Sequence, residues 1–183
     1  MIYYRIAMRA RKIIHLALDL LGLHADSMGI RKRKAGRGAM ASVFDVAAYI
    51  LAKKKSLTTV KLQKLVYYCQ AWSLVWDERP IFKARVEAWA NGPVVPHLFW
   101  QHQGKFRVSA KDFSQGNPDK LTNDEKETIE AVLKHYGDKS AQWLVDLTHM
   151  EDPWSAARGN CSPGKPCNNE ITHASMMDYY SGL

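Results

Sequence analysis

Residues 59–76 constrain the fold more than any other part of this 183-residue chain. At helical spacing, the apolar side chains of this segment cover more than one face of a helix, whereas a surface helix carries a single apolar stripe. The set is Val60, Leu62, Leu65, Val66, Cys69, Trp72, Leu74, Val75 and Trp76. Such a helix has to be enclosed by other elements, so we predict that residues 59–76 form the central helix of the core.

The segments around this helix carry helix start signals of their own. Ser42 or Asp45 can cap a helix that ends at three consecutive lysines. Thr122 and Glu125 have the spacing of a capping box, in which each side chain bonds to the backbone N–H of the other residue. Pro96 suits the first turn of a further helix, because proline lacks the N–H that would be unpaired there.

Strand signals are few and short. Residues 85–90 alternate between polar and apolar, residues 105–109 fit one short strand, and the region from Ile171 fits a last strand or turn followed by a helix. We therefore expect a mainly α fold, a compact single-domain bundle of five to seven helices with two or three very short strands.

The positive charge of the chain is concentrated at one end. The formal net charge is +8, from 26 bases and 18 acids. Residues 1–39 hold nine of these bases and two of these acids, which gives +7 and leaves 17 bases and 16 acids in residues 40–183. The near-neutral body has no long-range attraction for phosphate, so we expect nucleic acid to be contacted, if at all, by residues 1–39.

Residues 1–39 are therefore assigned as a basic N-terminal extension and residues 40–183 as the folded domain. Three interpretations of the extension stay open: a tail that binds a membrane surface or nucleic acid, a helix that binds a partner, or a stretch that precedes a natural start at Met40. No run of about 18 uninterrupted apolar residues is present, so we predict no transmembrane segment.

The three cysteines predict reduced thiols. Cys69 falls within the central helix, and Cys161 and Cys167 fall within a loop rich in proline and glycine. An odd count does not indicate a disulfide scaffold, so we expect free thiols in a cytoplasmic protein. A zinc site formed by the two loop cysteines with His149 or His173 is disfavoured because the spacing is uncommon, and we predict neither metal nor cofactor.

Three blocks in order resemble the Panacea domain family, which contains SocA-like antitoxins and phage-associated GepA-like proteins. The blocks are TVKLQKLVYYCQAW at 59–72, VEAWANGPVVP at 86–96 and HMEDPW at 149–154. The combination is specific and the resemblance spans residues 40–183. It implies an antitoxin of a bacterial or prophage toxin–antitoxin system that neutralises a cognate protein toxin by direct contact. For one branch of the family, the resemblance implies an adaptor that also binds a protease.

Each block contains residues that we assign to the scaffold. Leu62, Leu65 and Trp72 lie at core spacing on the central helix, and Gly92 and Pro93 fix a backbone corner. In the third block, Asp152 suits an N-cap, Pro153 the first helical position, and Trp154 packs back on the core.

The remaining polar and aromatic positions of the first two blocks are the predicted partner-binding residues. Lys61, Lys64, Tyr67 and Gln70 are expected on the other faces of the central helix. Trp89 and Asn91 are expected beside the Gly-Pro corner, on a surface groove, since aromatic rings with polar tips anchor interfaces well.

Two other functions are weighed against the antitoxin. A nucleic-acid-binding regulator would depend on the basic residues 1–39. An enzyme is not expected, because no nucleophile elbow, phosphate-binding glycine loop or paired-histidine metal motif is present, and Glu151 or Asp152 alone does not make a catalytic site.

Overall fold

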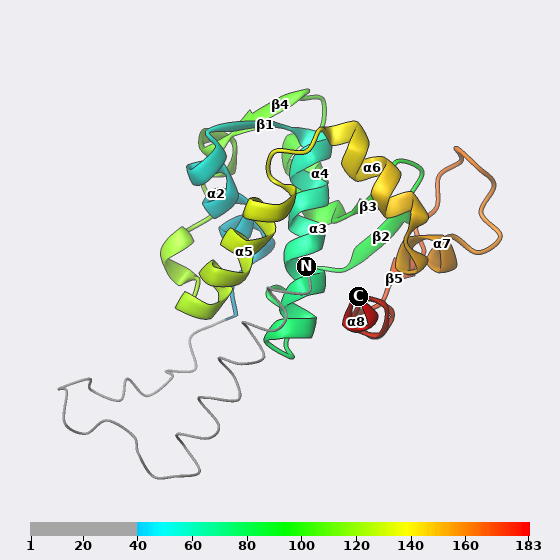
Figure 1. Ribbon diagram of the computed structural model, residues 1–183. Coiled ribbons are helices and arrows are strands. Elements are labelled where there is room, and N and C mark those ends of the chain that lie inside the picture. The colour runs from blue at the N-terminus through cyan, green and yellow to red at the C-terminus, as the bar shows by residue number, and fades with distance from the viewer. Residues whose placement is uncertain (1–39) are drawn as a thin grey trace, which may run out of the picture. The chain divides into compact units, whose positions relative to one another are not determined.

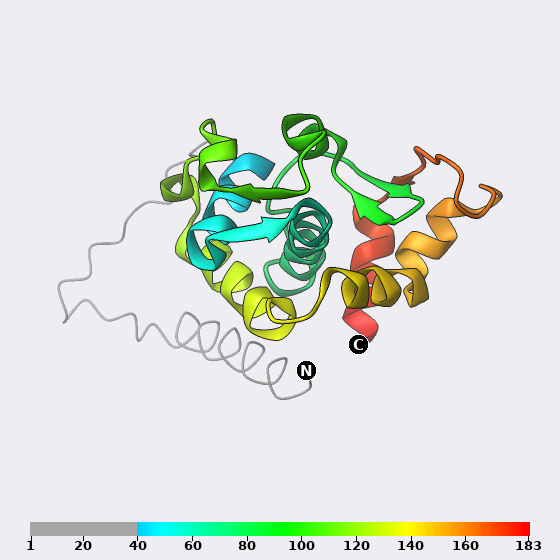
Figure 2. The ribbon, with the colours of Figure 1, turned by 90° about the horizontal axis from the view of Figure 1, so that it is seen from above.

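Helix α3 (Thr59–Trp76) lies in the middle of the computed structural model, which describes residues 40–183. Every residue of α3 from Leu62 to Leu74 is buried. Figures 1 and 2 show α2 and α5 on one side of α3, with α6, α8 and the larger sheet on the other. The predicted enclosure of residues 59–76 is therefore confirmed.

Seven α-helices lie within residues 40–183, which confirms the prediction of a mainly helical fold. Besides α3 they are α2 (Val43–Lys54), α4 (Pro96–His102), α5 (Asn123–Tyr136), α6 (Ala141–Met150), α7 (Asp152–Arg158) and α8 (His173–Gly182). Two 3₁₀ turns, η1 (Ala110–Phe113) and η2 (Pro118–Lys120), join β4 (Arg107–Ser109) to α5. Ser42 rather than Asp45 is the N-cap of α2, and Thr122 and Glu125 form the expected capping box of α5.

The described residues contain five short strands rather than the two or three expected. β1 (Ser56–Thr58) pairs antiparallel with β4. β2 (Val86–Trp89) lies between β3 (Gly92–Val94) and β5 (Glu170–Ile171) in a three-stranded antiparallel sheet. The sequence did not predict β1 and β3, because each is defined by pairing with a partner strand rather than by a pattern of its own.

Two glutamines of α3 bind the backbones of neighbouring segments. The Gln70 amide accepts from the N–H groups of Ile81 and Phe82 at 3.0 and 3.2 Å and donates to the Phe82 carbonyl at 3.0 Å. The Gln63 amide accepts from the Val95 N–H at 2.9 Å and donates to the Val95 carbonyl at 3.4 Å. These bonds attach the chain on both sides of the β2–β3 hairpin to α3.

A buried carboxyl group joins three helices. Glu151, the residue before α7, accepts hydrogen bonds from Tyr68 of α3 at 3.0 Å and from Tyr180 of α8 at 2.6 Å. The Tyr180 hydroxyl also lies 3.1 Å from that of Tyr67. Burial raises the pKa of Glu151 to about 7, although the two tyrosine hydroxyls lower it in part.

Residues 40–182 form one compact unit. In this described part of the chain, no helix is both long and apolar enough to span a bilayer. The three interpretations of residues 1–39 fall outside the described residues and stay predictions.

The Glu151 carboxyl group should make stability depend on pH. Its folded-state pKa of about 7 exceeds the ordinary value of 4.5. At a pH between these two values, the folded chain therefore keeps a proton that the unfolded chain releases. Stability should therefore fall between pH 5 and pH 8, by roughly 2–3 kcal/mol from this group. Glu151→Gln keeps an acceptor for the tyrosines and should remove this slope.

Urea unfolding at pH 5 and pH 8 measures the effect. Glu170→Gln, at an exposed strand position, is the matched control and should keep the wild-type slope. The assignment would be contradicted if Glu151→Gln lost as much stability with rising pH as the wild type.

Candidate functional site

A cavity of about 400 Å³ opens beside the N-terminal half of α3. Its walls come from α3, the β2–β3 hairpin, α4 and the loop between α7 and β5. The lining residues are Thr59, Val60, Gln63, Lys64, Trp89, Ala90, Asn91, Val94, Phe99, His102, Gly164, Pro166, Cys167 and Asn168. The cavity thus lies where the first two sequence blocks meet.

The aromatic wall of the cavity is held in place from several directions. The Trp89 and Phe99 rings meet edge to face, with centroids 4.8 Å apart. The Trp89 indole N–H donates to the Glu87 carboxylate at 2.8 Å, and the Trp89 carbonyl accepts from the Trp154 indole at 2.9 Å. Glu87 in turn pairs with Arg85 at 3.1 Å. A wall fixed in this way loses little conformational entropy when a ligand binds.

Lys64 is the charged residue of the cavity lining. Its side chain is only 1 % exposed, and its Nζ donates to the Pro93 carbonyl at 3.0 Å, the single hydrogen bond it makes to the residues described. Burial lowers the pKa of Lys64 to about 7, because the charged form loses its hydration. A neutral amine is therefore readily available at this position.

Gly92 forms the hairpin corner for two reasons. Its φ of +92° lies in the region that disfavours other residues. A Cβ at this position would also lie 2.8 Å from Lys64 Nζ and 2.7 Å from Thr148 Oγ1. Glycine thus lets the hairpin approach both α3 and α6, and Pro93 presents its carbonyl to the lysine.

The cavity brings together three of the six predicted partner-binding residues, Lys64, Trp89 and Asn91. Lys61 is half-buried on α3 and does not line the cavity. The expectation of an outward face is wrong for three of them: Lys64 is buried at the cavity wall, and Tyr67 and Gln70 are fully buried away from it, because α3 has no free face there. Tyr67 and Gln70 contact α8 and the segment after α3 instead.

The third sequence block supports the hairpin from outside the cavity. The Trp154 ring stacks on His149 at 4.0 Å while its N–H binds the hairpin backbone. The predicted cap is displaced by one residue: α7 begins at Asp152, and Glu151 is the N-cap, with Pro153 in the first turn. The Glu151 side chain turns inward to the tyrosines, so α7 has no side-chain cap.

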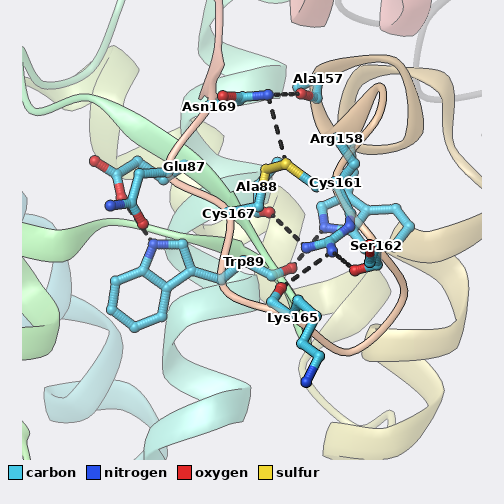
Figure 3. Close-up of a disulfide and its surroundings, with 12 residues drawn as sticks. Glu87, Ala88, Trp89, Ala157, Arg158, Cys161, Ser162, Lys165, Cys167 and Asn169 are labelled. Atoms are coloured by element: carbon cyan, nitrogen blue, oxygen red, sulfur yellow. Dashed lines mark hydrogen bonds between the residues drawn. A yellow bond between two sulfur atoms is a disulfide. The ribbon is translucent and has the colours of Figure 1, made fainter.

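The loop that closes the cavity contains a disulfide, which corrects the prediction of free thiols. Cys161 and Cys167 are bonded, with Cα atoms 6.0 Å apart, because the chain between them turns back on itself. Figure 3 shows the Arg158 guanidinium inside this turn, where it donates to the carbonyls of Ala88, Ser162 and Lys165 at 2.7–3.1 Å. Arg158 thereby connects the loop to β2.

No motif in the sequence indicated several of the lining residues. Phe99 and His102 come from α4, and Gly164, Pro166, Cys167 and Asn168 come from a loop outside the three blocks. The only signal for these residues in the sequence was that glycine and proline interrupt the periodic pattern of apolar residues. Within the described residues, no three His, Cys, Asp or Glu side chains are grouped so that they could hold a metal ion.

Comparison with known proteins agrees with the family resemblance. The family model described as antitoxin SocA-like, Panacea domain, matches residues 62–155, about half of the chain. The chain is 34 % identical over 125 residues to antitoxin SocA of Caulobacter vibrioides (strain NA1000 / CB15N). This alignment covers 60 % of the chain and 66 % of that protein, just under two thirds of its length. No solved structure matches the chain.

The disulfide predicts a definite thiol count. Protein unfolded without reductant should show one reactive thiol, from Cys69, and three after treatment with dithiothreitol. The closed loop is short, so replacing both loop cysteines by serine should lower the free energy of unfolding by about 2 kcal/mol. In reductant, the wild type and this double variant should be equally stable. Three thiols without reductant would contradict the bond.

Lys64 predicts the opposite pH dependence to that of Glu151. Because its folded-state pKa of about 7 lies below the ordinary 10.5, the unfolded chain binds more protons between these values. Stability should therefore rise from pH 7 to pH 9, by about 2 kcal/mol from this residue. Lys64→Met should lose the rise in urea unfolding, whereas the exposed control Lys134→Met should keep it. A rise that persists in Lys64→Met would mean that the amine does not titrate in this range.

Proposed function

We propose that this chain, which belongs to the SocA-like Panacea domain family of antitoxins, neutralises a cognate protein toxin inside the cell by binding it directly. One observation supports the proposal most strongly. Residues from two sequence blocks, Lys64 from the first and Trp89 and Asn91 from the second, line one cavity that is open to the surface.

The lining of the cavity suits binding better than catalysis. Most of it is apolar or aromatic, as in sites where a side chain of a partner becomes buried. The side chains in it that could serve as base or nucleophile are already bonded within the protein: Lys64 to Pro93, His102 to Gln63 at 2.9 Å, and Cys167 to Cys161 in the disulfide. None of these groups is paired with a second acid, base or nucleophile, as catalysis would require.

Neutralisation can follow two routes with different readouts. If the antitoxin blocks the toxin by occupying its active surface, the toxin concentration in the cell stays constant while its activity falls. If the antitoxin delivers the toxin to a protease, the half-life of the toxin shortens in its presence. To distinguish the two routes, translation is stopped in cells with and without this protein, and the amount of toxin that remains is followed over time by immunoblot.

Binding to nucleic acid is the competing function, and the concentration of positive charge in residues 1–39 supports assigning it to that segment. Comparing the full chain with a chain starting at Met40 in a salt titration of DNA binding tests it. Salt-dependent binding by the full chain alone would support an additional regulatory role for the extension.

Co-expression with the adjacent open reading frame tests the main proposal. The neighbour alone should arrest growth, and this protein should restore it. Trp89→Ala and Asn91→Ala should each weaken binding of the purified toxin at least about tenfold by calorimetry, because they remove part of the cavity wall. Trp143→Ala, on the exposed side of α6, is the control and should bind normally.

Melting temperatures near that of the wild type would show that the variants are folded. A neighbour that is harmless, or a toxin that still kills in the presence of this protein, would overturn the proposal.

A further inference from the structure

Three apolar side chains are exposed on, or next to, helices α3 and α4, which line the cavity. Val60 is 39 % exposed, and Trp100 and Phe106 are 63 % and 77 % exposed; we call the last two side chains the aromatic rim. Val60 lines the cavity itself. The Trp100 ring meets that of the lining residue Phe99 at 5.3 Å.

Phe106 belongs to the same surface through the backbone. Its carbonyl accepts a hydrogen bond from the N–H of the lining residue Thr59 at 3.1 Å. Trp100 and Phe106 are thus direct neighbours of residues that line the cavity, on α4 and beside the start of α3. Tryptophan and phenylalanine are enriched at the centres of protein interfaces, and contiguous exposed apolar surface marks an interaction site.

The lining of the cavity contains no carboxylate among the described residues. The nearby acid Glu87 is paired with Arg85, and Asp112 is paired with Lys105.

Two exposed bases remain without an acidic partner among the described residues. Lys165 lies between the lining residues Gly164 and Pro166, and its ammonium extends away from the loop in Figure 3. Arg107 follows Phe106, and its guanidinium bonds to the hydroxyl and carbonyl of Ser56 rather than to a carboxylate. A partner with acidic residues would thus meet complementary charge at Lys165 in the cavity loop and at Arg107 next to Phe106.

We propose that the aromatic rim and the cavity together bind an acidic segment of the toxin with an apolar anchor. One aromatic or aliphatic side chain of the toxin enters the cavity, its neighbours pack on Trp100 and Phe106, and flanking carboxylates lie against Lys165 and Arg107. This inference rests on the proposed antitoxin function, and it specifies the chemistry of the partner surface.

The apolar half of the inference is tested with the purified product of the adjacent open reading frame. The double variant Trp100→Ser/Phe106→Ser should bind at least about tenfold more weakly than the wild type, because two anchors of the interface are lost. The stability of this variant should be unchanged, since both side chains are exposed. Met150→Ser is the matched control, because Met150 is 73 % exposed but lies outside the cavity and the aromatic rim.

The charged half is tested by reversal. Lys165→Glu and Arg107→Glu should each slow association by several-fold, and the loss should shrink at high salt. Lys134→Glu, on the exposed face of α5, should leave the association rate unchanged. Replacing an acidic residue of the toxin by lysine should restore binding to one of the reversed variants.

The outcomes separate this inference from the proposed function. If the wild type fails to bind or neutralise the neighbouring protein, the antitoxin proposal itself fails. If the wild type neutralises it and Trp100→Ser/Phe106→Ser, Lys165→Glu and Arg107→Glu do so equally well, the toxin binds elsewhere and only this inference is overturned. A loss in the apolar variant without any effect of charge reversal would overturn the acidic character of the segment.

Discussion

The polar side chains of an enclosed helix cannot reach water, and in this domain the bonds that satisfy them organise the fold around α3. Gln63 binds the backbone of Val95, Lys64 binds that of Pro93, and Gln70 binds that of Phe82. Leaving such a group unpaired would cost about 1–3 kcal/mol, so each bond strongly favours one position of its partner segment. Because two of the three partners, Pro93 and Val95, lie in the Gly-Pro corner or just after it, the same bonds position the hairpin wall of the cavity.

The central helix and its caps could be predicted because they depend on local sequence. Apolar residues on several faces of 59–76 required burial, and Ser42, Thr122 and Glu125 could be recognised as caps from their spacing. Spacing alone could not show that Tyr67 and Gln70 also point inward, since the segments that cover them pack on α3 only in the folded chain. Tyr67 meets Tyr180, which lies 113 residues further along the chain.

The cavity was predictable only in part for the same reason. Lys64, Trp89 and Asn91 belong to blocks with strong local signals, whereas Phe99 and the loop residues that line the cavity reach it through the tertiary fold. The pairing of Cys161 with Cys167 likewise depends on how Arg158 folds the loop against β2, which no count of cysteines shows. Local sequence thus identified one wall of the site, and long-range packing added the others.

The order in which the elements are synthesised has a consequence for the nascent chain. Helix α3 emerges early, but its cover includes α8, and the bond from Gln70 to His173 spans 103 residues. At about 5–20 residues per second, a ribosome needs about 5–20 s to make the intervening chain. During that interval an apolar helix with unsatisfied amide and hydroxyl groups is exposed. The nascent chain should therefore be more open to proteases before α8 has been made than after the domain is complete.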